Sequence, residues 1–155
     1  MDDERYGPAK AAEAALIDAM NAKNMHYEKT GEFTYAFAVE GDDLAMFFRV
    51  KIDPELKIAY LHCPQQFVVP PDKRRDVAIA VNGINCKLID GSFDFDADDG
   101  TLSFRMTTTF VESLISPDVF CYMIECAAAT VDEYNDKLFG ICAGFIDALE
   151  YIKTL

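Results

Sequence analysis

The spacing of apolar residues changes several times along the chain, and each change marks an expected structural element. In residues 9–25 the apolar positions recur every three or four residues, among many helix-favouring Ala, Leu, Lys and Glu residues. Pro8 suits a first helical turn. We predict a helix from Ala9 to Met25, with residues 1–7 frayed. The apolar face of this helix consists of Ala12, Leu16, Ala19 and Met20.

A period of two follows. Every second residue is apolar and mostly large in the segments 33–39, 44–51 and 56–60, which are separated by the turn sequences EGDD and DPE. Such alternation places one set of side chains on one face of a strand, and short turns join antiparallel neighbours. We predict a three-strand antiparallel meander. The residues expected on its core face include Phe37, Phe48 and Tyr60.

A second helix and a hairpin come next. Pro70 and Pro71 end the third strand and can open a helix, in which apolar residues recur at helical spacing up to Leu88. Two more alternating segments then surround the sequence DADDG, with Phe95 and Phe104 expected in the core. The Asp-Gly pair at 99–100 predicts a tight hairpin turn.

The acidic sequence in this hairpin raises the question of calcium binding. If Asp94, Asp96 and Asp98 took the first ligand positions of an EF-hand loop, Asp99 would replace the required glycine and Arg105 the final glutamate. Strands rather than helices also flank the segment. We interpret it as a turn and expect no metal site.

The last quarter of the chain is helical in pattern. Ser116 is a favourable N-cap, Pro117 suits the first turn, and we predict a helical tract from Pro117 to Thr154 with an apolar stripe at spacings of four and three. Thr130 and Glu133 match a capping box, so a break near residue 129 remains open. The stripe consists of Phe120, Ile124, Ala127, Val131, Tyr134, Leu138, Ile141, Phe145, Ala148 and Ile152.

These elements define an α+β protein: helix, three-strand meander, helix, two-strand hairpin and long C-terminal helical tract. We expect a single domain over residues 1–155, with an antiparallel sheet that carries helices mainly on one face. An apolar fraction of 51% is sufficient for a core. The net charge of −13 argues against nucleic acid and anionic membranes as partners. No apolar run is long enough to span a membrane.

The cysteines indicate a reducing compartment. There are five, none in a CxxC pair, and the acidic N-terminus does not resemble a signal peptide. We therefore expect a cytoplasmic protein with free thiols.

No constellation for catalysis or cofactor binding is present. His62 adjoins Cys63, but neighbouring residues on a strand point to opposite faces and cannot act as a base and its nucleophile. Cys121 and Cys126 lie on different sides of a helix, and no glycine-rich nucleotide motif occurs. We predict a protein that is not an enzyme and has no cofactor. An enzyme with a shallow acidic site is the remaining alternative.

The outward face of the meander is the candidate binding surface. Its side chains are small or apolar apart from a few cations, which suits a peptide or another subunit, unless terminal segments of the chain cover it. Gly140 and Gly144 form a second candidate, a small-residue strip on the last helix. The candidate residues on the sheet are Ala36, Ala38, Phe47, Arg49 and Leu61.

The length of the C-terminal helical tract favours association with another chain. Residues 117–154 as one helix would span roughly 57 Å, whereas a sheet of five strands is only about 24 Å wide. Either the tract bends or its overhang packs on another chain. We expect a homodimer.

Several segments resemble the YbjN family. They are VAIAVNGINCKL, which contains Val81, Asn82 and Asn85, then DGSFDFD, DDGTLSFRM and DEYNDKLFGICAG. The resemblance covers most of residues 8–150, and the order of elements resembles the type III secretion chaperone-like fold. It implies a regulator of sensory transduction without catalytic residues, and chaperone relatives that bind client segments and dimerise.

We therefore interpret the chain as a non-catalytic, protein-binding or chaperone-like adaptor of the bacterial cytoplasm, whose partner is a protein or peptide client. The alternative function is that of a regulatory partner in bacterial signal transduction.

Overall fold

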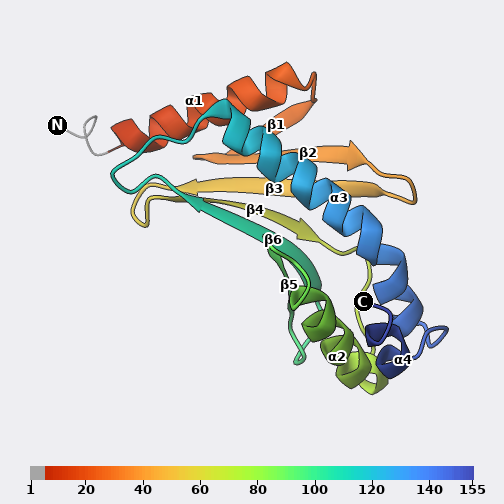
Figure 1. Ribbon diagram of the computed structural model, residues 1–155. Helices are drawn as coiled ribbons and strands as arrows, with labels where there is room; N and C mark the ends of the chain where they lie inside the picture. Colours follow the sequence, from red (N-terminus) through yellow and green to blue (C-terminus); the bar gives the residue numbers. More distant parts are fainter. Residues whose placement is uncertain (1–5) are drawn as a thin grey trace.

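The computed structural model describes residues 6–155 (Figure 1). Residues 1–5, where most of the predicted frayed segment falls, lie outside the described residues, and Gly7 already begins the first helix. The elements are α1 Gly7–Ala22, β1 Tyr27–Gly31, β2 Thr34–Glu40, β3 Ala45–Asp53, β4 Ile58–Pro64, the 3-10 helix η1 Pro71–Lys73, α2 Arg74–Asn85, β5 Ser92–Phe95, β6 Leu102–Thr109, α3 Pro117–Cys142 and α4 Ala148–Ile152.

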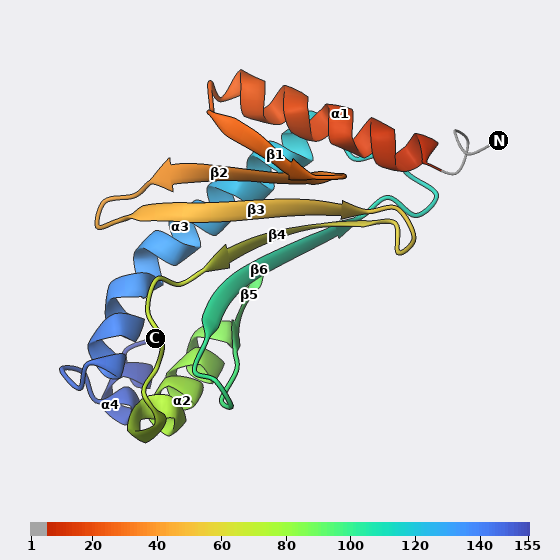
Figure 2. The same cartoon turned by 180° about the vertical axis from the view of Figure 1, so that it is seen from behind.

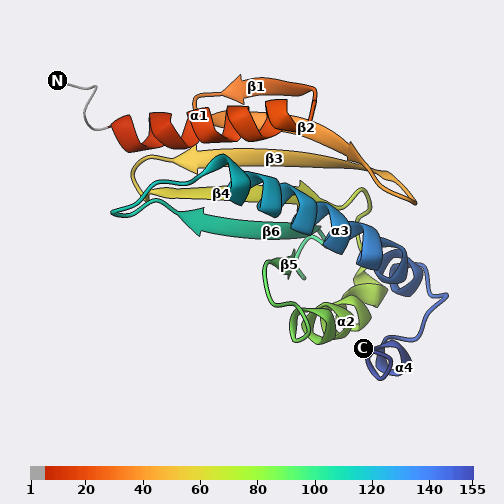
Figure 3. The same ribbon diagram turned by 45° about the horizontal axis from the view of Figure 1, so that its top comes forward.

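The six strands form one antiparallel sheet in the order β1-β2-β3-β4-β6-β5. Helices α1 and α3 lie next to each other across one face of this sheet (Figures 1 and 3). The opposite face carries no helix of the described chain (Figure 2). The predicted α+β class, with an antiparallel sheet and helices on one side, is confirmed.

Hydrogen bonds tie α1 to the strands beneath it. Glu13 accepts from Lys29 Nζ at 2.6 Å and from the Tyr35 hydroxyl at 2.7 Å. Burial raises the pKa of the Glu13 carboxyl, but the bonds from Lys29 and Tyr35 outweigh it, and the pKa is lowered. Lys23 also pairs with Glu125 of α3, which links the two helices on this face.

The strand β1 was not predicted. Its sequence, YEKTG, has no apolar alternation because it is an edge strand whose residues are largely exposed. Tyr27 pairs with Phe37 of β2, and the register shifts between Lys29 and Gly31. Phe33, expected in a strand, lies in the connecting turn with φ of 54° and is buried.

The register of β4 differs from the prediction by one residue. Leu61 pairs with Val50 and Ala59 with Ile52, and all four are buried on the helix-covered face. Tyr60 therefore lies on the opposite face, because a shift of one residue reverses every side chain of a strand. Phe37, Phe48 and Phe104 are buried as expected.

The loop between β5 and β6 is a turn, but a longer one than predicted. Phe95 pairs with Leu102, and within the loop between them Gly100 alone has a positive φ, of 82°. Asp96 and Asp99 accept hydrogen bonds from backbone amides of the loop itself. Among residues 6–155 there is no group of three or more His, Cys, Asp or Glu side chains that could hold a metal ion.

Helix α3 is continuous through residue 130. The Thr130 hydroxyl donates to the Cys126 carbonyl at 2.8 Å and does not cap a new helix. Ser116 is the N-cap, as predicted, and accepts from the amide of Val119. The helical tract breaks instead after Cys142, and Asp147 caps the short α4 by accepting from the amide of Glu150. The apolar stripe is buried or half-buried up to Ile141, whereas Phe145 lies in the break with 85% of its surface exposed.

Candidate protein-binding face

The candidate site is the sheet face without helices, which we call the open face. Strand pairing aligns one row of outward side chains across its centre: Ala36 on β2, Arg49 on β3, His62 on β4 and Arg105 on β6. Directly paired residues have Cβ atoms about 4.5–5.5 Å apart, so each side chain of this row lies beside the next one. A second row consists of Thr34, Lys51, Tyr60 and Thr107.

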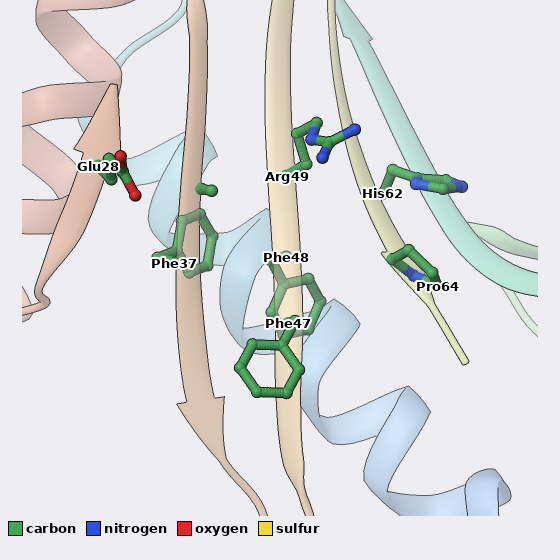
Figure 4. Close-up of a pocket in the computed structure, with 8 residues that line it drawn as sticks. Glu28, Phe37, Phe47, Phe48, Arg49, His62 and Pro64 are labelled. Carbon is green, nitrogen blue, oxygen red and sulfur yellow. The ribbon is translucent and has the colours of Figure 1, made fainter. Parts of the chain in front are cut away.

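Two open depressions adjoin these rows. One, of about 300 Å³, is lined by Phe47 and Pro64 among others (Figure 4). The other, of about 580 Å³, includes Lys51 in its lining. Arg49 and His62 line both depressions, so a ligand in either one contacts the same two side chains.

Phe47 is the main apolar group of the open face, with 56% of its side chain exposed. It pairs with Ala38 of β2, and Arg49 with Ala36. Because alanine side chains end at Cβ, no long side chain of β2 lies directly beside the phenyl ring. Figure 4 shows the ring in front of β3, on the side of the sheet away from α3. Packing an apolar side chain against this ring would remove apolar surface from water.

The cations of the open face differ in their partners. Arg105 forms an ion pair with Asp94 at 2.6 Å, and this hydrogen bond raises the pKa of the guanidinium. Arg49 and Lys51 have no ion pair with any residue in the described part of the chain. Burial lowers the pKa of His62, and the charges of Arg49 and Arg105 lower it further against the opposing effect of Asp94.

The structure brings four of the seven predicted binding residues together. Ala36, Ala38, Phe47 and Arg49 lie on adjacent strands of the open face. Leu61 does not, since the shifted register of β4 buries it in the core.

The predicted glycine strip does not exist. Gly140 is buried, and a Cβ at this position would lie 2.6 Å from Ile146 of the same chain. Gly144 lies beyond the end of α3 with φ of 81°, where it reverses the chain direction. Its role is that of a helix C-terminal glycine. Both glycines therefore serve the turn between α3 and α4.

Sequence reasoning missed Tyr60 and His62 as members of this face. In the segment IAYLHC, both sets of alternate residues contain apolar side chains: Ile58 and Tyr60 in one set, and Ala59, Leu61 and Cys63 in the other. The alternation alone therefore does not predict which set faces the core. Cys63 was the available signal: it follows Leu61 by two residues, and a cysteine is among the most buried residue types.

Cys63 and His62 do point to opposite faces, as predicted. Cys63 is buried in the core, and burial raises the pKa of its thiol to about 12. A thiol with this pKa is not a thiolate at neutral pH, and the imidazole is on the other side of the sheet.

Comparison with known proteins agrees with this fold. A family model described as "Putative bacterial sensory transduction regulator", YbjN, matches residues 13–140. The chain therefore belongs to the YbjN family. The crystal structure of YbjN from E. coli, described as a putative transcription regulator, is similar with a TM-score of 0.57 and 11% identity, over 80% of this chain and 91% of that chain. At this identity the similarity shows the fold alone. No curated protein matches the chain.

Within residues 6–155, no helix combines the length and the apolar character needed to cross a membrane.

Proposed function

We propose that this protein is a non-catalytic adaptor that binds a segment of another protein on the open face of its sheet. The observation that carries the proposal is the arrangement around Phe47. A large apolar ring stands exposed among alanines, beside Arg49 and Lys51, which form no ion pair with the described residues, on a face that the described chain leaves uncovered.

The family description supports a regulatory rather than a metabolic role. A signalling protein is the partner class that fits this description, and a chaperone client is the partner class that fits the fold resemblance. Both use the same surface. The burial of Cys63, away from His62, supports the non-catalytic part of the proposal.

We place this function in the bacterial cytoplasm. The five cysteines are all free thiols, including the exposed Cys86. Free exposed thiols are typical of a reducing compartment.

The test is affinity capture from an extract of the native host, quantified by mass spectrometry. The bait is wild-type protein, Phe47→Glu or Leu114→Glu. Leu114 is an apolar residue with 79% exposure in the β6–α3 connection, so its substitution controls for a new surface charge. We expect at least one protein that is retained by wild type and Leu114→Glu and lost with Phe47→Glu. Equal retention by all three baits would show that the open face is not the binding surface.

A further inference from the structure

The centre of the open face carries a charge opposite to that of the whole molecule. The chain carries 14 basic and 27 acidic residues, with a net charge of −13. On three neighbouring central strands, however, the outward positions hold Arg49, Lys51, His62 and Arg105. Charge of one sign gathered on a small area attracts ligands of the opposite sign.

The carboxylates near this area leave two cations uncompensated. Asp94 is occupied by Arg105 through two hydrogen bonds. Asp53, at the end of β3, accepts from the amides of Glu55 and Leu56 in the next turn. Arg49 and Lys51 have no carboxylate of the described chain within ion-pair distance.

We propose, on the basis of the function proposed above, that the open face binds an acidic protein segment. Two of its carboxylates pair with Arg49 and Lys51, and an apolar side chain packs on Phe47.

Geometry defines the segment further. Phe47, Arg49 and Lys51 are alternate residues of one strand, so their Cα atoms follow each other at about 6.6 Å. Carboxylates two residues apart in an extended segment, or four apart on a helix, have a similar separation. The apolar side chain then lies at the Phe47 end, where the smaller depression adjoins the ring.

A nucleic acid is a poorer match. A nucleic acid carries a phosphate at every nucleotide along its length. The cations of the open face, in contrast, lie only on the central β-strands and are bordered by Glu28 on β1 and Asp94 on β5. A polyanion longer than a few nucleotides would extend over these carboxylates and the acidic remainder of the molecule. A short acidic segment ends before it reaches them.

A second copy of the chain is also a poorer match on this face. A two-fold interface places the same patch against itself, so Arg49 and Lys51 of one protomer would approach those of the other. Like charges in such a contact are unfavourable.

The experiment selects short random peptides displayed on phage against wild-type protein and removes those that also bind Phe47→Glu. The recovered sequences are then synthesised, and their Kd is measured by fluorescence anisotropy. The variants are Arg49→Ala/Lys51→Ala and, as control, Lys137→Ala/Lys153→Ala, which removes two exposed cations from α3 and from the residue after α4. A single-stranded oligonucleotide of matching charge is a third probe.

We expect the recovered peptides to carry at least two Asp or Glu residues near an apolar one. Their Kd should rise about tenfold or more in Arg49→Ala/Lys51→Ala and change little in the control. Added salt should also raise the Kd for the wild-type protein, because it screens the charges. Circular dichroism of each variant confirms that it is folded.

Each outcome decides a different point. Peptides that depend on Phe47 but are neutral or basic overturn the acidic ligand and leave the proposed function standing. If no peptide depends on Phe47, the proposed function fails as well. An oligonucleotide that binds more tightly than the peptides, and that needs Arg49 and Lys51, replaces the protein segment by a nucleic acid.

Discussion

At the scale of single residues, the two aromatic side chains Phe47 and Phe104 show how position on a strand decides role. Both belong to strands of the sheet, yet Phe104 is completely buried against Phe93, whereas Phe47 is 56% exposed on the open face. The first stabilises the core, and the second is available for binding. The sequence alone predicted both assignments, because the alternation in β3 and β6 is unambiguous.

Stability measurements should separate these two roles. Phe104→Ala removes a buried ring and leaves a cavity, so we expect the free energy of unfolding to fall by about 3–5 kcal/mol. Phe47→Ala should change it by only about 0.5 kcal/mol, as is usual for surface substitutions. Urea denaturation monitored by circular dichroism measures both. A loss for Phe47→Ala as large as that for Phe104→Ala would show that the open face is packed against something.

For the proposed binding of an acidic segment, we expect His62 to cause a pH dependence whose sign follows from its neighbours. In the free protein, burial and the charges of Arg49 and Arg105 lower its pKa, against the effect of Asp94. A bound carboxylate would raise this pKa, so binding takes up a proton.

The affinity for an acidic peptide should therefore increase as the pH falls from the pKa of the complex to that of the free protein, which lies below 6.5. Below that value His62 is protonated in both states, and its contribution becomes constant. In His62→Gln this rise should disappear, as measured by anisotropy titrations across the range. A rise of the same size in the variant would assign the effect to another group.

At the scale of elements, the predictions succeeded where local pattern and tertiary packing agree. The helices α1 and α2 follow from the spacing of their apolar residues, and the start of α3 follows from the N-cap Ser116. The strand β1 could not be predicted, since a polar edge strand is held by pairing with β2 rather than by its own apolar residues. The continuity of α3 was equally hidden, because a Thr130 hydroxyl can cap a helix or bond back within one.

The packing of α4 on α2 depends on a glycine. A Cβ at Gly83 would lie 2.7 Å from Cγ2 of Ile152, so the two elements approach this closely only because position 83 has no side chain. Alanine favours an isolated helix by about 1 kcal/mol, but here overpacking should outweigh that gain.

We expect Gly83→Ala to lower the free energy of unfolding by about 1–3 kcal/mol. In an Ile152→Ala background, where the space is free, the same substitution should be neutral or stabilising. A double-mutant cycle by urea denaturation measures this coupling. Additive effects would mean that α4 does not rest on Gly83.

At the scale of the whole molecule, the sheet divides the surface into a helix-covered side and an open side. Because the open face carries cations without an ion pair to the described residues, another surface is a better candidate for self-association. Phe145 is 85% exposed in the break between α3 and α4, and Leu149 of α4 is 56% exposed. We expect these residues to contribute to a homodimer contact.

Light scattering tests this expectation directly. The wild-type protein at micromolar concentration should show twice the chain mass of 17.3 kDa, and Phe145→Glu should reduce it to a single mass. Phe47→Glu is the control and should remain dimeric. A wild-type mass near that of one chain excludes the dimer. A dimer that persists in Phe145→Glu but dissociates in Phe47→Glu would move the contact to the open face.

The most direct measurement of the binding surface is site-specific photocrosslinking in living cells of the native host. A photoreactive residue replaces either Phe47 on the open face or Tyr122, which is 51% exposed on α3. We predict a crosslink from position 47 to another protein that weakens when Arg49 and Lys51 are also replaced by alanine, and none of comparable yield to that protein from position 122. A partner captured from position 122 and not from position 47 would contradict the assignment of the open face.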